Sequence, residues 1–175
     1  MSHQILVALV ENKSGVLNRV ASLFRKRQFN IDSLTVGRTE DDAISRMTIA
    51  VDGSKTNVEQ VIKQLYKIVN VLKVSNVTND ETVIRETLLI KVHATKSTRT
   101  EVLQYADVFR AKTVDISPET LMFELTSRPA KIDAFVEAMR PFGIREMVRT
   151  GVTAMNRGKS GEVRAGGKKT APPKE

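Results

Sequence analysis

The chain has 175 residues, of which 41% are hydrophobic and 27% charged, and its formal net charge is +8. This composition is typical of a globular protein that is long enough for two small domains. It contains no cysteine, which excludes disulfides and thiol catalysis, and its two distant histidines argue against a metal centre. No apolar run approaches the ~18 residues of a membrane span, and the first residues lack a signal-peptide layout, so we expect a cytoplasmic protein.

Half of the net charge lies in the segment 157–175, which carries six basic and two acidic residues. This segment is rich in Gly, Lys, Pro and Ala and has few large apolar side chains. Burial of its side chains would therefore not offset the loss of conformational entropy on folding. We predict a disordered basic tail. It is either a solubilising extension or a weak electrostatic contact for nucleic acid or an acidic partner.

The first half of the chain alternates between strand-like and helix-like patterns. A continuous apolar run at 5–10 predicts a central strand, and apolar residues at helical spacing follow a polar turn at 11–15. Extended segments at 31–38 and 45–51 flank the acidic turn Glu40-Asp41-Asp42. A helix from Thr56, opened by a capping box with Glu59, precedes a last strand at 71–77. The order is βαββαβ.

The same order recurs about 80 residues later. Strands are expected at 84–94, 112–116, 121–125 and 144–152, and helices at 98–109, with a capping box Thr98–Glu101, and at 129–139. The sequence therefore predicts an α+β fold of two tandem ferredoxin-like units, at 1–78 and 82–156, with a joint at 79–81. The free face of each sheet is expected to stay open and the edge strands to pair with a second copy, which predicts a homodimer.

No residue pattern indicates an active site. Ser14 has no histidine near it, and the acidic turn at 40–42 reads as a solvated loop. Gly166-Gly167 has neither a strand before it nor a helix after it, as a phosphate-binding loop would need.

The turn after the first strand is more informative. Asn12, Ser14 and Gly15 immediately precede a helix, where unpaired N–H groups and the helix dipole can hold a carboxylate. The simpler alternative is an ordinary N-cap by Ser14 or Asn12. Asn30, after the same helix, can likewise be interpreted as a left-handed C-terminal cap.

Several blocks of sequence together resemble the ACT domain, a ligand-sensing module, and more closely the regulatory small subunit of acetohydroxyacid (acetolactate) synthase. The resemblance runs from about Gln4 to Arg157 and does not extend to the tail. The blocks that carry it are 9–17 (LVENKSGVL), 29–36 (FNIDSLTV), 45–49 (SRMTI), 64–69 (QLYKIV), 85–86 (RE) and 109–111 (FRA).

The resemblance implies an N-terminal effector-binding ACT domain in a protein without cofactors or chemistry of its own. The partner would be a catalytic subunit that carries thiamine diphosphate, Mg²⁺ and usually FAD, and that condenses pyruvate with pyruvate or 2-oxobutyrate. The small subunit would raise its activity and confer feedback inhibition, usually by valine. The second unit is expected to contribute dimer stability and a contact with the catalytic subunit.

The resemblance also implies an effector site at the interface of two protomers. Asn12, Gly15 and Val16 would come from one protomer, and Asn30 and Ile31 from the other. Ser14 belongs to the same turn, and Leu17 would join the apolar residues that receive the effector's aliphatic chain. Since a pocket discriminates one methylene by only about 1–3 kcal/mol, leucine and isoleucine are expected to act more weakly.

The sequence leaves two other functions as alternatives. Ferredoxin-like sheets also bind RNA, but that readout uses aromatic side chains on the central strands, and the positions here are Val7, Leu9, Met47, Ile49 and Val51. A stand-alone enzyme with an unrecognised site would turn over pyruvate without a partner.

Overall fold

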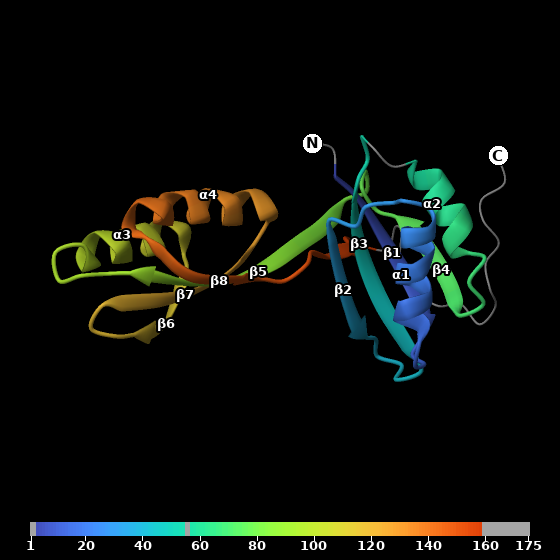
Figure 1. The fold of residues 1–175 in the computed structure, drawn as a ribbon, viewed down its shortest axis with the longest axis horizontal. Coiled ribbons are helices and arrows are strands. Elements are labelled where there is room, and N and C mark those ends of the chain that lie inside the picture. The colour runs from blue at the N-terminus through green and yellow to red at the C-terminus, as the bar shows by residue number, and fades with distance from the viewer. Residues whose placement is uncertain (1–2, 55–56, 159–175) are drawn as a thin grey trace. The chain divides into compact units, whose positions relative to one another are not determined.

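The computed structural model describes residues 3–54 and 57–158. They form two compact units (Figure 1). One consists of the described residues up to Val83 together with those from Val152 onward, and the other is Ile84–Gly151. Each unit has an antiparallel sheet and two helices in the order that the sequence predicts, so the predicted fold of two ferredoxin-like units is confirmed. No helix in the described ranges has the length and apolar character to cross a bilayer.

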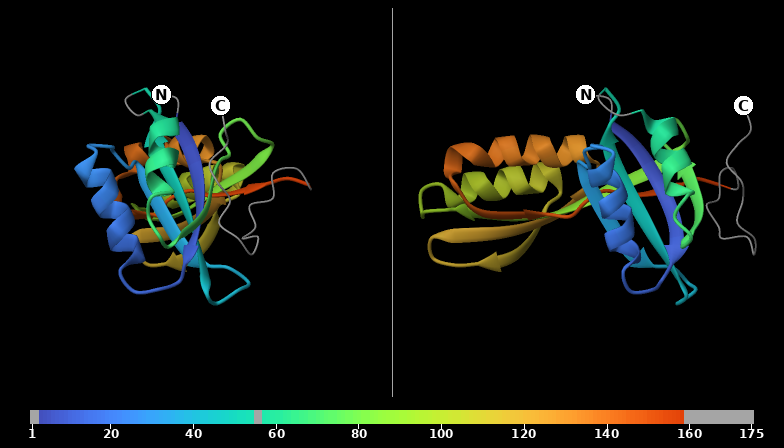
Figure 2. Two further views of the ribbon diagram at one scale, coloured as in Figure 1. Left: turned by 90° about the vertical axis from the view of Figure 1, so that its right-hand side faces the viewer. Right: turned by 45° about the vertical axis from the view of Figure 1, so that its right-hand side comes forward.

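The first sheet has the strand order β2-β3-β1-β4. Its elements are β1 (His3–Glu11), α1 (Val16–Lys26), β2 (Ser33–Arg38), β3 (Ile44–Asp52), α2 (Val58–Leu65) and β4 (Val71–Asn76). Both helices cover the same face of this sheet, as the two views in Figure 2 show. The core between them combines alternate residues of the central strands, such as Leu6, Ala8 and Val10, with Val20 and Phe24 of α1.

The second sheet has the order β6-β7-β5-β8. Its elements are β5 (Thr82–His93), α3 (Arg99–Phe109), β6 (Lys112–Ile116), β7 (Thr120–Ser127), α4 (Pro129–Met139), a 3-10 turn (Arg140–Phe142) and β8 (Ile144–Arg149). Phe135 of α4 lies in the core of this unit. The centroid of its ring is 6.1 Å from that of Phe123 and 5.2 Å from that of Phe109. Pro129 occupies the first turn of α4, where its missing N–H costs nothing.

A short strand, β9 (Thr153–Asn156), returns to the first unit and pairs with β5. The backbone N–H of Val152 donates to Ser33 Oγ at 3.3 Å, and Arg46 Nη2 donates to the carbonyl of Ala154 at 2.8 Å. Both contacts lie on the face of the first sheet that the helices leave free, where Val7 and Leu9 are buried. The expectation that this face stays open is therefore wrong for the first sheet.

The return of β9 also moves the boundaries away from those predicted. The sequence places 82–156 in the second unit, but Val152 and Ala154 alternate with exposed residues and bury their side chains in the first unit. The predicted disordered tail begins at Arg157, yet the N–H of Arg157 donates to the carbonyl of Glu81 at 2.7 Å. The rest of that tail, 159–175, lies outside the described residues.

Of the two predicted capping boxes, one lies partly outside the described residues and the other is not formed. Thr56 lies outside the described residues, and the N-cap of α2 is Asn57, whose side chain accepts from Gln60 N at 3.1 Å. Thr98 does occupy the N-cap of α3, but its side chain makes no cap bond; its Oγ1 accepts from the N–H of Thr95 instead. The Thr98 capping box is therefore not formed.

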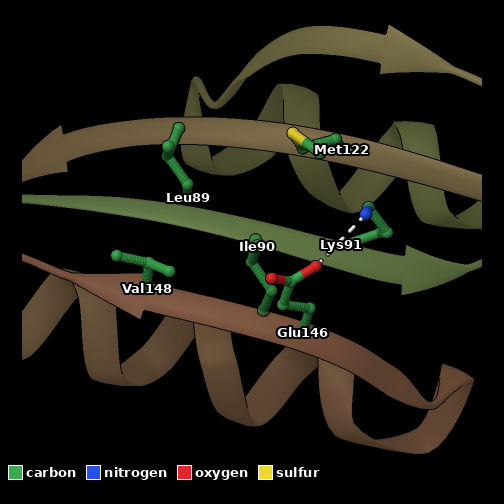
Figure 3. Close-up of a pocket in the computed structure, with 6 residues that line it drawn as sticks. All are labelled: Leu89, Ile90, Lys91, Met122, Glu146 and Val148. Carbon is green, nitrogen blue, oxygen red and sulfur yellow. Dashed lines mark hydrogen bonds and ion pairs between the residues drawn. The ribbon is translucent and has the colours of Figure 1, made fainter.

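The second sheet keeps one face free of helices. A shallow hollow of about 110 Å³ lies on it, lined by Leu89, Ile90, Lys91, Met122, Glu146 and Val148 (Figure 3). An ion pair between Lys91 Nζ and Glu146 Oε2, at 3.2 Å, borders this hollow. Here the expectation of an open face holds.

Candidate functional site

The turn between β1 and α1 is held from both sides by neighbouring strands. The N–H of Glu11, the last residue of β1, donates to the carbonyl of Asn70 just before β4, at 2.9 Å. On the other side the backbone N–H of Asn12 donates to the carbonyl of Ala43 at 2.7 Å, and its side-chain Nδ2 donates to the carbonyl of Asp42 at 2.8 Å. The turn is thus anchored to the β2–β3 hairpin and to β4 before any ligand binds.

Gly15 is the N-cap of α1, and its backbone is left-handed, with φ +79° and ψ −5°. Glycine adopts this conformation at no steric cost, whereas other residues are strained there. The N-cap is Gly15, and neither Ser14 nor Asn12 caps the helix with its side chain, so the interpretation of either as an ordinary N-cap is wrong. A Cβ at Gly15 would meet no atom within 4 Å, which leaves the approach to the helix end open.

The charges around this helix end favour an anion. The first turn of α1 contains no acidic residue, and its first N–H groups lie at the positive end of the helix dipole. Glu11 is the nearest carboxylate along the chain, and its Oε2 accepts from Asn70 Nδ2 at 2.5 Å and lies 3.2 Å from Lys13 Nζ. The Asn70 amide, and after it Lys13, lowers the pKa of the Glu11 carboxyl.

The predicted site residues of this turn differ in exposure. Asn12, Ser14 and Gly15 are exposed, and Leu17 keeps 45% of its surface accessible. Val16 is 3% exposed and belongs to the core of its own unit. Its side chain therefore anchors the start of α1, and among these apolar residues only Leu17 presents a side chain to solvent.

The far end of α1 closes in a Schellman motif. Gln28 takes the left-handed conformation with φ +56°, the N–H of Phe29 donates to the carbonyl of Phe24 at 3.0 Å, and the N–H of Gln28 donates to that of Arg25 at 3.1 Å. The rings of Phe24 and Phe29 meet edge to face with centroids 6.1 Å apart. The prediction of Asn30 as a left-handed cap is therefore wrong, because Gln28 fills that role.

Asn30 and Ile31 follow this motif. Asn30 is exposed and its Nδ2 donates to Asp32 Oδ1 at 3.2 Å, while Ile31 is half-buried against the core of the first unit. The whole of α1 separates them from the turn at 12–15 (Figure 1). At 1.5 Å per residue this is about 16 Å, so a single chain does not bring the two predicted halves of the site together.

Sequence reasoning missed Asn70. Its side chain is 7% exposed and joins the turn to α1, since Asn70 Oδ1 also accepts from Arg19 Nη1. Nothing in its local sequence links it to a turn 59 residues earlier; a lone buried amide immediately before a predicted strand is the only signal available. Within the described ranges no group of three or more metal-ligating side chains comes together.

The central strand positions of the first unit do not form an exposed platform. Val7, Leu9, Met47, Ile49 and Val51 are each at most 2% exposed. In the first sheet the helices cover one face and the segment with β9 contacts the other, so these five side chains offer bases no surface on which to stack.

Comparison with known proteins gives two consecutive family matches. The family described as "AHAS small subunit-like ACT domain" matches residues 6–73, and the family described as "Small subunit of acetolactate synthase" matches residues 85–158. The second match includes β9, which the structure places in the first unit.

Individual proteins agree with these matches. The "Probable acetolactate synthase small subunit" of Archaeoglobus fulgidus is 52% identical over 158 residues, covering 90% of this chain and 98% of that protein. The acetolactate synthase small subunit of Bacillus subtilis is 47% identical over 156 residues, covering 89% and 91%. The crystal structure of the acetolactate synthase small subunit from Thermotoga maritima matches with a TM-score of 0.83 at 38% identity, covering 91% of this chain and 99% of that one.

Proposed function

The chain belongs to the acetolactate synthase small-subunit family, and from this premise we propose that it is the regulatory subunit of that enzyme. It binds the catalytic subunit, raises its activity and makes it sensitive to feedback inhibition by a branched-chain amino acid, with valine as the first candidate. It has no active site of its own; thiamine diphosphate, Mg²⁺ and FAD belong to the catalytic subunit. The observation that carries this proposal is the exposed, uncapped N-terminus of α1 behind a left-handed glycine.

The proposed effector site receives the amino acid's carboxylate at this helix end. The N–H groups of the first turn donate to the carboxylate, and the exposed Asn12 and Ser14 lie in the same turn. Leu17 of this protomer and Ile31 of the second receive the aliphatic side chain, and Asn30 of the second protomer binds the polar end. Val16 contributes through its place in the core, which fixes the start of α1.

A homodimer completes this site. Among the described residues the edge strand β2 pairs only with β3, and Val36 of β2 and Leu17 of α1 are 42% and 45% exposed. Pairing β2 with that of a second copy satisfies its free backbone groups and buries apolar surface. A second copy also supplies Asn30 and Ile31 to the proposed site. This agrees with the position of these two residues beyond α1, away from the turn of their own chain.

Binding across two chains provides the regulatory device. An effector that bridges the protomers stabilises one arrangement of the dimer over another, and the catalytic subunit responds to that arrangement. The second unit supports the dimer and contacts the catalytic subunit. By linkage, the catalytic subunit must then change the affinity for the effector by the same factor.

The test is calorimetric titration of the purified chain with valine, leucine and isoleucine, with and without the catalytic subunit. We expect saturable heat with valine first in affinity and a changed affinity once the catalytic subunit is present. Acetolactate formation from pyruvate should be absent with this chain alone and should rise when it is added to the catalytic subunit. No heat from any of the three amino acids in either state would refute the sensor function.

A further inference from the structure

Asn70 connects three elements around the β1–α1 turn. Its Nδ2 donates to Glu11 Oε2 at 2.5 Å, its carbonyl accepts from the N–H of Glu11 at 2.9 Å, and its Oδ1 accepts from Arg19 of α1. A single buried residue before β4 thus holds both the backbone and the side chain of the last residue of β1. The same residue contacts α1, whose first residue, Val16, lies five positions after Glu11.

The charge of Glu11 explains why this matters. A carboxylate is attracted to the positive end of a helix, and Glu11 lies only a few residues before α1. If its side chain were free to turn, it would compete with a ligand's carboxylate for the same N–H groups. The amide of Asn70 and the ammonium of Lys13 hold the Glu11 carboxylate by two contacts to its Oε2.

Asn70 is suited to this task by its chemistry. It donates to a carboxylate and accepts from a guanidinium at the same time, and a side-chain amide does both from one small planar group. An aspartate could accept from Arg19 but not donate to Glu11. An alanine could do neither, so the half-buried Glu11 and the exposed Arg19 would each lose a hydrogen-bond partner.

We propose that Asn70 is a positioning residue of the effector site: it holds Glu11 away from the N-terminus of α1 and keeps the turn ready for a carboxylate. This inference rests on the proposed function of the turn. It adds a residue from the α2–β4 connection to a site otherwise built from the β1–α1 turn and the segment after α1.

The central experiment exchanges the two polar groups. In Asn70→Asp the contact with Arg19 is kept, but the donor to Glu11 becomes a second carboxylate. We expect valine to bind about tenfold more weakly by calorimetry, since a hydrogen bond to a charged group is lost. Combining Asn70→Asp with Glu11→Gln restores one amide and one carboxylate with the bond reversed, and affinity should return to within about threefold of the original. Asn79→Asp, at an exposed position, is the matched control and should bind valine normally.

Two further measurements separate positioning from general stability. Amide hydrogen exchange of residues 12–15, without ligand, should quicken in Asn70→Asp and slow again in the double variant. An NMR titration of Glu11 should show its pKa below the ordinary range in the native protein and higher in Asn70→Ala, because the Asn70 amide is the first cause of the lowering and Lys13 the second. Thermal unfolding of each variant records any loss of fold.

The outcomes are distinct. Native valine affinity in Asn70→Asp, or a loss that the double variant does not recover, overturns the positioning role. Unchanged exchange of the turn in Asn70→Asp also overturns it. If the native chain binds no branched-chain amino acid in any state, the proposed function fails, and the exchange and titration data still decide whether Asn70 holds the turn.

Discussion

Gly15 offers a comparison that separates charge from shape. Gly15→Asp and Gly15→Asn introduce side chains of nearly equal size, and both residue types tolerate a left-handed backbone better than other non-glycine residues. The left-handed φ of +79° costs either variant about 1 kcal/mol of unfolding free energy. Steric clash adds nothing, because a Cβ at Gly15 has no neighbour within 4 Å. We therefore expect both variants to fold and to activate the catalytic subunit.

The two variants should differ in their response to valine. A carboxylate about 4 Å from the effector's own carboxylate is repelled by about 1 kcal/mol in water and about 4 kcal/mol at the effective dielectric constant of a protein surface. Relative to Gly15→Asn, this raises the half-saturating valine concentration by roughly fivefold to a thousandfold in Gly15→Asp. The assay is acetolactate formation by the reconstituted enzyme over a valine titration. Equal half-saturation for the two variants, with intact folding of both, would refute the assignment of the site to this helix end.

Two further substitutions, one in each unit, test how buried contacts contribute to the free energy of unfolding. Arg149 makes a two-pronged ion pair with the buried Glu86, with Nε–Oε1 2.7 Å and Nη2–Oε2 3.0 Å, so Arg149→Ala should lower the free energy of unfolding by about 3 kcal/mol in urea denaturation. Its control, Arg140→Ala, breaks an exposed pair and should change that free energy by less than about 0.5 kcal/mol; equal effects would contradict the reasoning. In β9, Ala154→Glu places a carboxylate against the first sheet and should cost about 2 kcal/mol or more, with added binding of a hydrophobic dye. Met155→Glu, at a position 66% exposed, should be close to neutral, and a similar loss in both variants would show that β9 does not cover the sheet.

Most of the fold could be predicted because the periodicity of apolar residues records which face of each element is buried. The unbroken apolar run at 5–10 predicts a central strand, and β1 indeed lies between β3 and β4. The periodicity of apolar residues does not indicate which of the two sheets a strand packs against. The sequence therefore predicts Val152 as the end of the preceding strand and Ala154 as part of the second unit, although both residues pack in the first unit.

The candidate site was predictable only where its signal is local. The turn before α1 can be recognised in the sequence because a glycine stands between a predicted strand and a predicted helix. Gly15 indeed has the left-handed backbone conformation that favours glycine. At the far end of α1 the left-handed residue is Gln28 and not the predicted Asn30, because Gln28 in this conformation lets Phe29 pack against Phe24. Asn70 acts over 59 positions of sequence, and no local pattern encodes such a contact.

The return of β9 makes the second unit an insertion within the first. The two crossing points lie beside each other, since Thr82 Oγ1 donates to Asn156 Oδ1 at 3.1 Å and the N–H of Arg157 donates to the carbonyl of Glu81. A short hairpin turn could therefore replace Ile84–Gly151 and leave the covering strand in place. The same junction could accept a foreign domain whose own termini are close together. In engineering terms, the first unit has an insertion position, at which an optical reporter domain could replace the second unit.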